Sequence, residues 1–142
     1  MNTELYQEVL LQHSRRPRNF GPLEGATHRA EGLNALCGDE VTVELALDGD
    51  TVRAAHFNGS ACAICTASAS ILTCEVAGQS VTTARSLAEG FRKLAVSGEA
   101  TEEISKRPRL EVMGSVHKFP QRVKCATLPW ETLLGALEHP VG

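Results

Sequence analysis

Three cysteines and one aspartate are the residues of this sequence best suited to chemistry. Cys37 and Asp39 stand two residues apart in a Cys-Gly-Asp motif, directly before an alternating apolar run. The intervening glycine permits a backbone conformation that turns both side chains to the same side. Cys62 precedes an expected helix, whose N-terminal dipole favours a thiolate, and Cys125 also lies near an expected helix start. Thiolates and carboxylates both bind metal ions, so the pattern indicates a metal site or sulfur chemistry.

Each of these residues also has a purely structural interpretation. A cysteine is often a small buried hydrophobic residue, and an aspartate before a strand is often a turn residue. Cys65 forms a C-x-x-C pair with Cys62, and residues three apart lie on nearly one face of a helix. No second pair completes a zinc finger, so Cys65 is interpreted as a packing residue or as a further thiol beside the site. Cys74, further along the same expected helix, is expected in the core.

Basic residues precede the last of these cysteines. Lys118, Arg122 and Lys124 lie within seven residues of Cys125. Scattered cations are usually solvated, which is the structural interpretation. Three thiolates and one carboxylate around a divalent cation would have a formal charge of about −2, which nearby Arg122 and Lys124 would stabilise.

Composition excludes several classes of function. The 142 residues carry 14 basic and 17 acidic side chains, for a net charge of −3, so neither nucleic acid nor an anionic membrane is expected as a partner. No apolar run approaches the roughly 18 residues of a membrane span, and the first residues do not resemble a secretory signal. We therefore expect a cytoplasmic protein with reduced thiols, and five cysteines, an odd number, disfavour a full disulfide framework. No hydrolase triad or phosphate-binding glycine loop is present.

Hydrophobic periodicity outlines the elements that would position these residues. Strands grouped ahead of several helices indicate an α+β fold, an antiparallel sheet with helices on one side, in a single domain over residues 1–142. The first expected elements are a helix that follows Asn2 and Thr3 and ends before Arg15, and an irregular surface segment over residues 14–36. A β-hairpin over 41–58, turning at 48–50, is expected next. Helices over 62–76 and 83–97, a weakly patterned stretch over 99–111 and a C-terminal helix with Pro129 in its first turn follow.

Four stretches of sequence together carry a family resemblance. They are LYQEVLLQHSRRPRNFG near the N-terminus, N-x-x-CGD at 34–39, C-x-I-x-x-ASAS at 62–70 and FPQRVKCATLPW at 119–130. With these motifs the chain resembles the iron–sulfur cluster assembly family that includes the NifU N-terminal domain, IscU and SufU. The resemblance implies a three-stranded antiparallel sheet packed by about five helices. It also implies that the three cysteines converge around a metal at one exposed end of the molecule.

Within this family the chain looks most like the SufU branch. Lys124 stands where the IscU branch has a histidine, and the stretch over residues 98–115 resembles an insertion of SufU. The resemblance implies Zn²⁺ held by Cys37, Asp39, Cys62 and Cys125, and a role in accepting persulfide sulfur from a cysteine desulfurase for delivery to a cluster scaffold or apo-acceptor. We expect Cys37 to be the acceptor, because its glycine-hinged loop can swing.

The departures from the family pattern include Cys65 and Pro129, and two rival functions remain open. Cys65 stands where serine is common, which makes a second acceptor or an alternative ligand conceivable, and Pro129 stands where alanine is common. The first rival is a scaffold that assembles a transient [2Fe-2S] cluster on the same residues, since thiolates suit iron as well as zinc. The second is a small domain whose zinc is purely structural.

Overall fold

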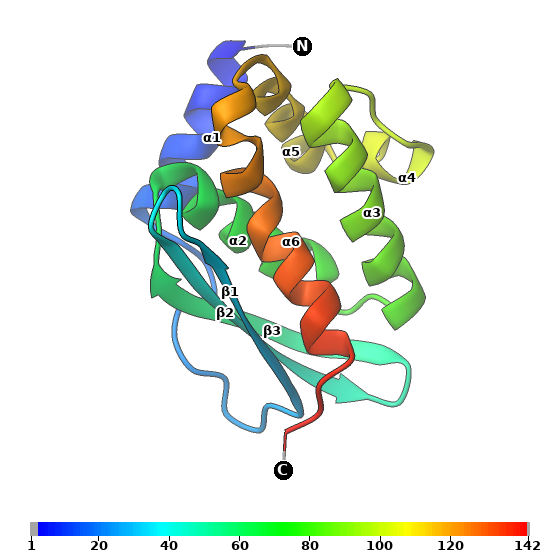
Figure 1. Cartoon of the computed structure of the whole chain (residues 1–142). Coiled ribbons are helices and arrows are strands. Elements are labelled where there is room, and N and C mark those ends of the chain that lie inside the picture. Colours follow the sequence, from blue (N-terminus) through cyan, green and yellow to red (C-terminus); the bar gives the residue numbers. More distant parts are fainter. Residues whose placement is uncertain (1–2, 142) are drawn as a thin grey trace.

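The computed structural model describes residues 3–141 as a small sheet covered by helices (Figure 1). Asn2, one of the expected helix caps, lies outside the described residues. The strands are β1 (His28–Asn34), β2 (Asp39–Asp48) and β3 (Thr51–Ser60). The helices are α1 (Thr3–Arg15), α2 (Ala63–Val76), α3 (Val81–Ser97), α4 (Glu102–Ser105), α5 (Pro108–Glu111) and α6 (Val123–Leu137), with short 3-10 helices η1 (Val112–Lys118) and η2 (Pro120–Arg122).

The three strands form one antiparallel sheet in the order β1-β2-β3, which confirms the predicted α+β fold and its sheet. Six α-helices lie within residues 3–141, where about five were expected. The register pairs Asn34 with Asp39 and Glu40 with Ser60. The turn that carries Cys37 and the end of β3 that leads to Cys62 therefore meet at the same end of the sheet.

A bulge in β3 at Arg53 explains why the buried face of this strand is ambiguous in the sequence. The pairing register shifts between Ala46 and Leu47, opposite the start of β3. Val52 is buried ahead of the shift, and Ala55 and Phe57 are buried after it. The extra residue breaks the simple alternation that a regular strand would show.

The expectation that residues 14–36 are irregular is wrong for their last part, because β1 occupies His28–Asn34. β1 is an edge strand with half-buried residues alternating with exposed ones, so its sequence lacks the apolar alternation of a core strand. Its burial comes from α6: a side chain at Gly32 would overlap Thr132 and press on Leu128. Glycine at this position allows the helix to approach the strand closely.

Helix α6 also departs from expectation, because it begins at Val123 and places Pro129 in its interior instead of its first turn. Proline has no backbone N–H, so the carbonyl of Cys125, four residues earlier, loses its helical partner. Cys74 also differs from expectation. It is partly exposed and lies outside both core clusters of the described residues.

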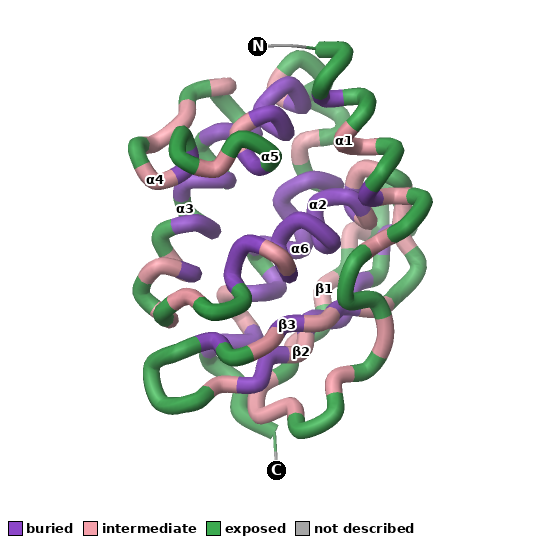
Figure 2. Tube along the Cα trace, turned by 180° about the vertical axis from the view of Figure 1, so that it is seen from behind, coloured by how far each residue is buried: buried purple, intermediate pink, exposed green. Residues whose placement is uncertain are grey.

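The core lies between the sheet and the helices, where α2 and α6 pack against one face of the sheet (Figure 1). Figure 2 shows the buried stretches on the inward sides of α2, α3 and α6. Buried small residues line α2, including Ala67, Ser68 and Ala69, and they let α1, α6 and the sheet approach it. None of the described helices has the length and apolarity needed to cross a bilayer.

An ion-pair network attaches the stretch between α3 and α6 to α2. The buried carboxylate of Glu75 accepts hydrogen bonds from Arg107, at 3.0 Å, and from Arg109. Ile104 and Leu110 from this stretch are fully buried in the main core. The weakly patterned sequence over residues 99–111 is therefore a folded part of the domain, held by a few buried residues in short helical turns.

A buried histidine joins α1 to α2. His13 Nδ1 lies 2.7 Å from the hydroxyl oxygen of Ser70, which also accepts the backbone N–H of Arg18 at 2.8 Å. Ser70 can therefore donate its own proton to a neutral imidazole. Burial, assisted by the charges of Arg18 and Arg109, lowers the pKa of His13 to about 4.

We expect His13 to make the fold less stable in mild acid. The unfolded chain takes up a proton near pH 6.5 and the folded chain only near pH 4, so stability present above pH 6.5 falls as the pH drops towards 4, by up to about 3 kcal/mol. Urea unfolding of the wild type and of His13→Gln at pH 7 and pH 4.5 measures this effect. The variant should lose less stability between the two pH values, and an equal loss would contradict the assignment.

Candidate metal centre

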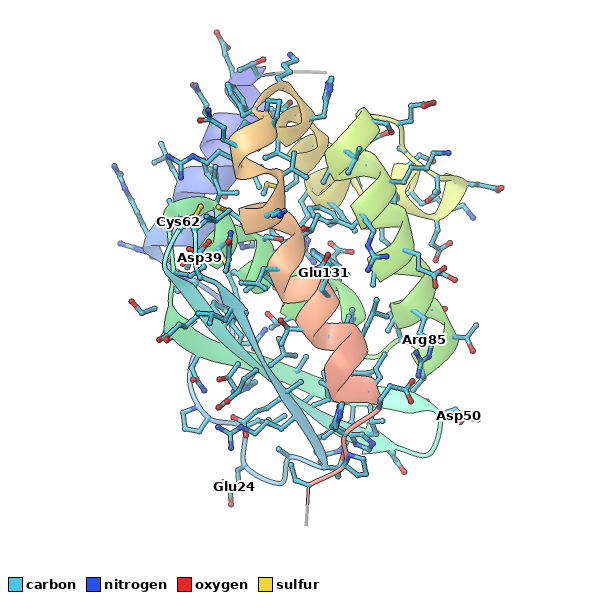
Figure 3. The ribbon with its side chains drawn as sticks, viewed as in Figure 1. Glu24, Asp39, Asp50, Cys62, Arg85 and Glu131 are labelled. Carbon is cyan, nitrogen blue, oxygen red and sulfur yellow. The ribbon has the colours of Figure 1, made fainter. Side chains whose placement is uncertain are left out.

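The candidate site lies at the end of the sheet where β2 begins and β3 ends. Figure 3 shows Asp39 and Cys62 close together at this end, beside the start of α2. Asp39 is the first residue of β2, and Cys125 comes from the first turn of α6. The β1–β2 turn, the connection from β3 to α2 and the start of α6 thus bring together residues that are far apart in the sequence.

Asp39 is the most constrained of these residues. Its side chain is fully buried, and its Oδ1 accepts the backbone N–H of Cys62 at 2.8 Å. Its Oδ2 is also buried and has no hydrogen-bond partner among the described residues. A buried carboxylate oxygen without a partner is costly unless a cation faces it.

Cys37 and Cys125 supply two thiols beside this carboxylate. The thiol of Cys125 donates to the sulfur of Cys37 at 3.4 Å. The two sulfurs and one carboxylate oxygen of Asp39 all lie within 4.8 Å of one another. Cys125 is buried and Cys37 is exposed, so the group reaches from the interior to the surface.

The turn that carries Cys37 joins β1 to β2. The backbone N–H of Cys37 donates to the carbonyl of Asn34. Gly38 has a φ of 72°, in the left-handed region that favours glycine. No atom lies within 4 Å of where a side chain at Gly38 would start. The turn is therefore free of packing on that side, whereas Asp39 and Cys125 are enclosed.

Cys62 borders the group. It is the N-cap of α2, and its sulfur accepts the backbone N–H of Cys65 at 3.4 Å. Its sulfur lies outside the set that meets within 4.8 Å, although the residue packs against the small apolar cluster that contains Cys125. The structure therefore places Cys37, Asp39 and Cys125 together and Cys62 at their edge.

Burial dominates the electrostatics of the enclosed thiols. Burial raises the pKa of Cys125, and its hydrogen bonds with Cys37, Asp39 and Cys62 raise it further. Burial likewise raises the pKa of Cys65, with smaller contributions from the negative charges of Asp39, Cys62 and Cys37. A cation that binds Cys125 must displace its proton, so binding at this site weakens as the pH falls.

The spacing of the thiols and the carboxylate fits a small cation with tetrahedral coordination and sulfur ligands. Zinc–sulfur bonds of about 2.3 Å place two tetrahedral thiolates roughly 3.8 Å apart, close to the 3.4 Å between Cys37 and Cys125. The unpartnered Oδ2 of Asp39 offers the oxygen donor. Three thiols and a carboxylate suit zinc or iron better than magnesium or calcium, which prefer oxygen ligands alone.

The auxiliary residues lie in different environments. Arg122 and Lys124 are both exposed, and neither forms an ion pair within residues 3–141, so their stabilising charge remains a prediction. Cys65 is fully buried in a small apolar cluster that also contains Cys125.

Sequence reasoning missed Tyr6. Its hydroxyl is buried without a hydrogen-bond partner among the described residues, and burial, followed by the charge of Cys62, raises its pKa. In the sequence Tyr6 belongs to the apolar stripe of α1, and nothing in that pattern separates it from a core residue.

Comparison with known proteins agrees with the motifs. A family model described as the NifU-like N-terminal domain matches residues 5–126. The chain is 37% identical over 129 residues to the zinc-dependent sulfurtransferase SufU of Bacillus subtilis (strain 168), which covers 91% of this chain and 86% of that protein. It is 36% identical over 135 residues to the iron-sulfur cluster assembly scaffold protein IscU of Streptococcus pyogenes serotype M1, covering 95% and 84%. The crystal structure of FiSufU from Fervidobacterium islandicum AW-1 aligns with a TM-score of 0.84 at 31% identity, covering 96% of this chain and 99% of that one.

Asp39→Asn tests whether the buried carboxylate is there for a cation. The amide can still accept the Cys62 N–H but removes the charge, so we expect zinc affinity to fall by about 100-fold or more. The metal-free variant should be at least as stable as the metal-free wild type, because an uncompensated buried charge is lost. Competition with a chromophoric zinc chelator and urea unfolding measure the two effects.

Asp50→Asn, at the exposed β2–β3 turn, is the matched control and should change neither quantity. Unchanged zinc affinity in Asp39→Asn would show that the carboxylate is not a ligand.

Proposed function

The chain belongs to the NifU-like N-terminal domain family of iron–sulfur cluster assembly proteins, and we propose that it is a zinc-dependent sulfur relay. In this role it accepts persulfide sulfur from a cysteine desulfurase and passes it to a cluster scaffold or apo-acceptor. The observation that supports the proposal most strongly is the meeting of two thiols with a buried carboxylate that has one unpartnered oxygen.

Zinc would be held by Cys37, Asp39 and Cys125, with Cys62 as the fourth ligand from the start of α2. When bound, zinc keeps coordinating thiols deprotonated at neutral pH. Arg122 and Lys124 offset the negative charge of such a site from the solvent side. Asp39, tied by Oδ1 to the Cys62 backbone, fixes the spacing between the end of β3 and the start of β2.

Cys37 is the residue best placed to accept sulfur. It is exposed on a turn with an unpacked glycine, whereas Cys125 is buried. Its thiolate attacks the terminal sulfur of the desulfurase persulfide; a new S–S bond forms on Cys37 as the old one breaks, and the electron pair leaves on the desulfurase thiolate. The exchange consumes no oxidant or reductant. The persulfide on Cys37 then faces solvent, where the next acceptor can reach it.

Assembly of a transient [2Fe-2S] cluster on the same residues is the second candidate. Thiolates suit iron as well as zinc, and the relative from Streptococcus pyogenes is named as a scaffold. Lys124 directly precedes Cys125. A protonated ammonium group cannot bind a metal, so this position offers a cluster no further ligand, which favours the relay over the scaffold.

A purely structural zinc is not favoured by the packing. The main core, built around residues such as Leu45, Leu72, Phe91 and Trp130, contains none of the four proposed ligands. A domain of this size with such a core does not need a metal to fold.

We expect the zinc protein, incubated with a cysteine desulfurase and cysteine, to gain one sulfur atom on Cys37. Trypsin separates the sites: residues 30–53 contain Cys37 alone, residues 54–85 contain three cysteines, and residues 125–142 contain Cys125 alone. When alkylation quenches the reaction early, before the sulfur moves on from Cys37, mass spectrometry should find the added sulfur in the 30–53 peptide. Cys37→Ala should gain none, and Cys74→Ala, outside the site, should gain as much as the wild type. Sulfur that still accumulates on Cys37→Ala would refute the assignment.

A further inference from the structure

Cys62 and Cys65 form a C-x-x-C pair at the start of α2, and the relay through Cys37 assigns sulfur to neither of them. Cys62 has an extended backbone as the N-cap, so its side chain folds back over the first turn of the helix. Its sulfur lies 3.4 Å from the backbone nitrogen of Cys65. Both residues belong to, or pack against, the small apolar cluster that contains Cys125. The first turn of the helix thus holds the backbone of Cys65 against the sulfur of Cys62.

We propose that Cys65 is a resolving thiol that releases relayed sulfur from Cys62 as sulfide, leaving a Cys62–Cys65 disulfide. This inference rests on the proposed function, because the relay supplies the sulfur. It adds a reductive step that converts a persulfide, the form in which sulfur arrives, into sulfide.

The step balances within the protein. Cys62 takes the terminal sulfur from the Cys37 persulfide by thiol–disulfide exchange, and the electron pair of the broken S–S bond returns to Cys37. The Cys65 thiol then attacks the inner sulfur of the Cys62 persulfide and gives its proton to the departing sulfur, which leaves as H₂S with the electron pair of that bond. The released sulfur is reduced by two electrons, and the two cysteine sulfurs are oxidised by one electron each. An external dithiol is needed only to reopen the disulfide before a second turnover.

The position of Cys62 suits this sequence of exchanges. Cys62 packs against the small cluster that contains Cys125, and the thiol of Cys125 donates to the sulfur of Cys37 at 3.4 Å. Cys62 therefore lies beside the Cys37–Cys125 pair, and Cys65 belongs to the same cluster from the first turn of the helix. Cys74, nine residues further along α2 than Cys65, lies outside this cluster.

A cavity of about 190 Å³ is lined in part by Cys65. Phe20 and Phe57, whose rings stack with centroids 5.2 Å apart, form one wall, and Thr66 and Asn58 add polar groups. The cavity is large enough for a small anion and several waters. It offers the released sulfide a place to go without displacing packed side chains.

The experiment follows one turnover in the absence of added reductant. Reduced wild-type zinc protein is loaded with sulfur by a cysteine desulfurase and cysteine under anaerobic conditions, and the donor is then removed by gel filtration. Sulfide is measured colorimetrically, and the 54–85 peptide is mapped after alkylation. We expect sulfide in proportion to a peptide that has lost two hydrogen atoms, with Cys62 and Cys65 unalkylated and Cys74 alkylated.

Cys65→Ser is the decisive variant, because serine is close in size to cysteine and cannot form a disulfide. It should retain the added sulfur and release at least about ten-fold less sulfide than the wild type. Cys74→Ser, on the same helix, is the matched control and should behave as the wild type. Circular dichroism and zinc content establish that both variants are folded and loaded. Equal sulfide release from Cys65→Ser, or a disulfide that excludes Cys65, would overturn the proposal.

A second arm separates this inference from the proposed function. Sodium polysulfide adds sulfur to accessible thiols without a desulfurase. If the desulfurase adds no sulfur, the relay fails, and the polysulfide-treated wild type and Cys65→Ser still decide the role of Cys65 by the same two measurements.

Discussion

The buried carboxylate of Asp39 is the constraint on which the site depends. One oxygen is held by the backbone of Cys62, and the other is enclosed without a partner among the described residues. Leaving a carboxylate in this state costs several kcal/mol unless a cation balances it. Since the thiols of Cys37 and Cys125 lie within 4.8 Å of this carboxylate, the same cation would gather all three side chains. The arrangement therefore makes physical sense as a site built to bind a metal.

The fold was largely predictable because its signals are local. Alternation in residues 41–47 and the helical stripe of α3 follow directly from the burial of one face. The family prediction, made from four separate motifs, was confirmed by the match over residues 5–126. The edge strand β1 could not be predicted from hydrophobic alternation, because its half-buried positions are not a run of apolar side chains. They are covered by α6, which packs closely over Gly32. The start of α6 was also missed. Proline is common in the first turn of a helix, so Pro129 indicated a later start than the observed Val123.

The candidate site was predictable in composition but not in detail. Residue types and motifs singled out Cys37, Asp39, Cys62 and Cys125, and their meeting at one end of the sheet follows from the register of β2 with β1 and β3. The sequence could not show that Cys62 borders the group instead of lying inside it, because this depends on how the N-cap side chain is turned. Nor could it show the buried hydroxyl of Tyr6.

Zinc K-edge X-ray absorption of protein purified under reducing conditions tests the central claim most directly, since it reports the number and type of atoms bound to the metal. The account predicts zinc with three sulfur neighbours at about 2.3 Å and one oxygen at about 2.0 Å. Asp39→Asn should lose the oxygen neighbour or lose zinc altogether. A zinc shell of nitrogen and oxygen atoms only, or iron with bridging sulfide in place of zinc, would contradict it.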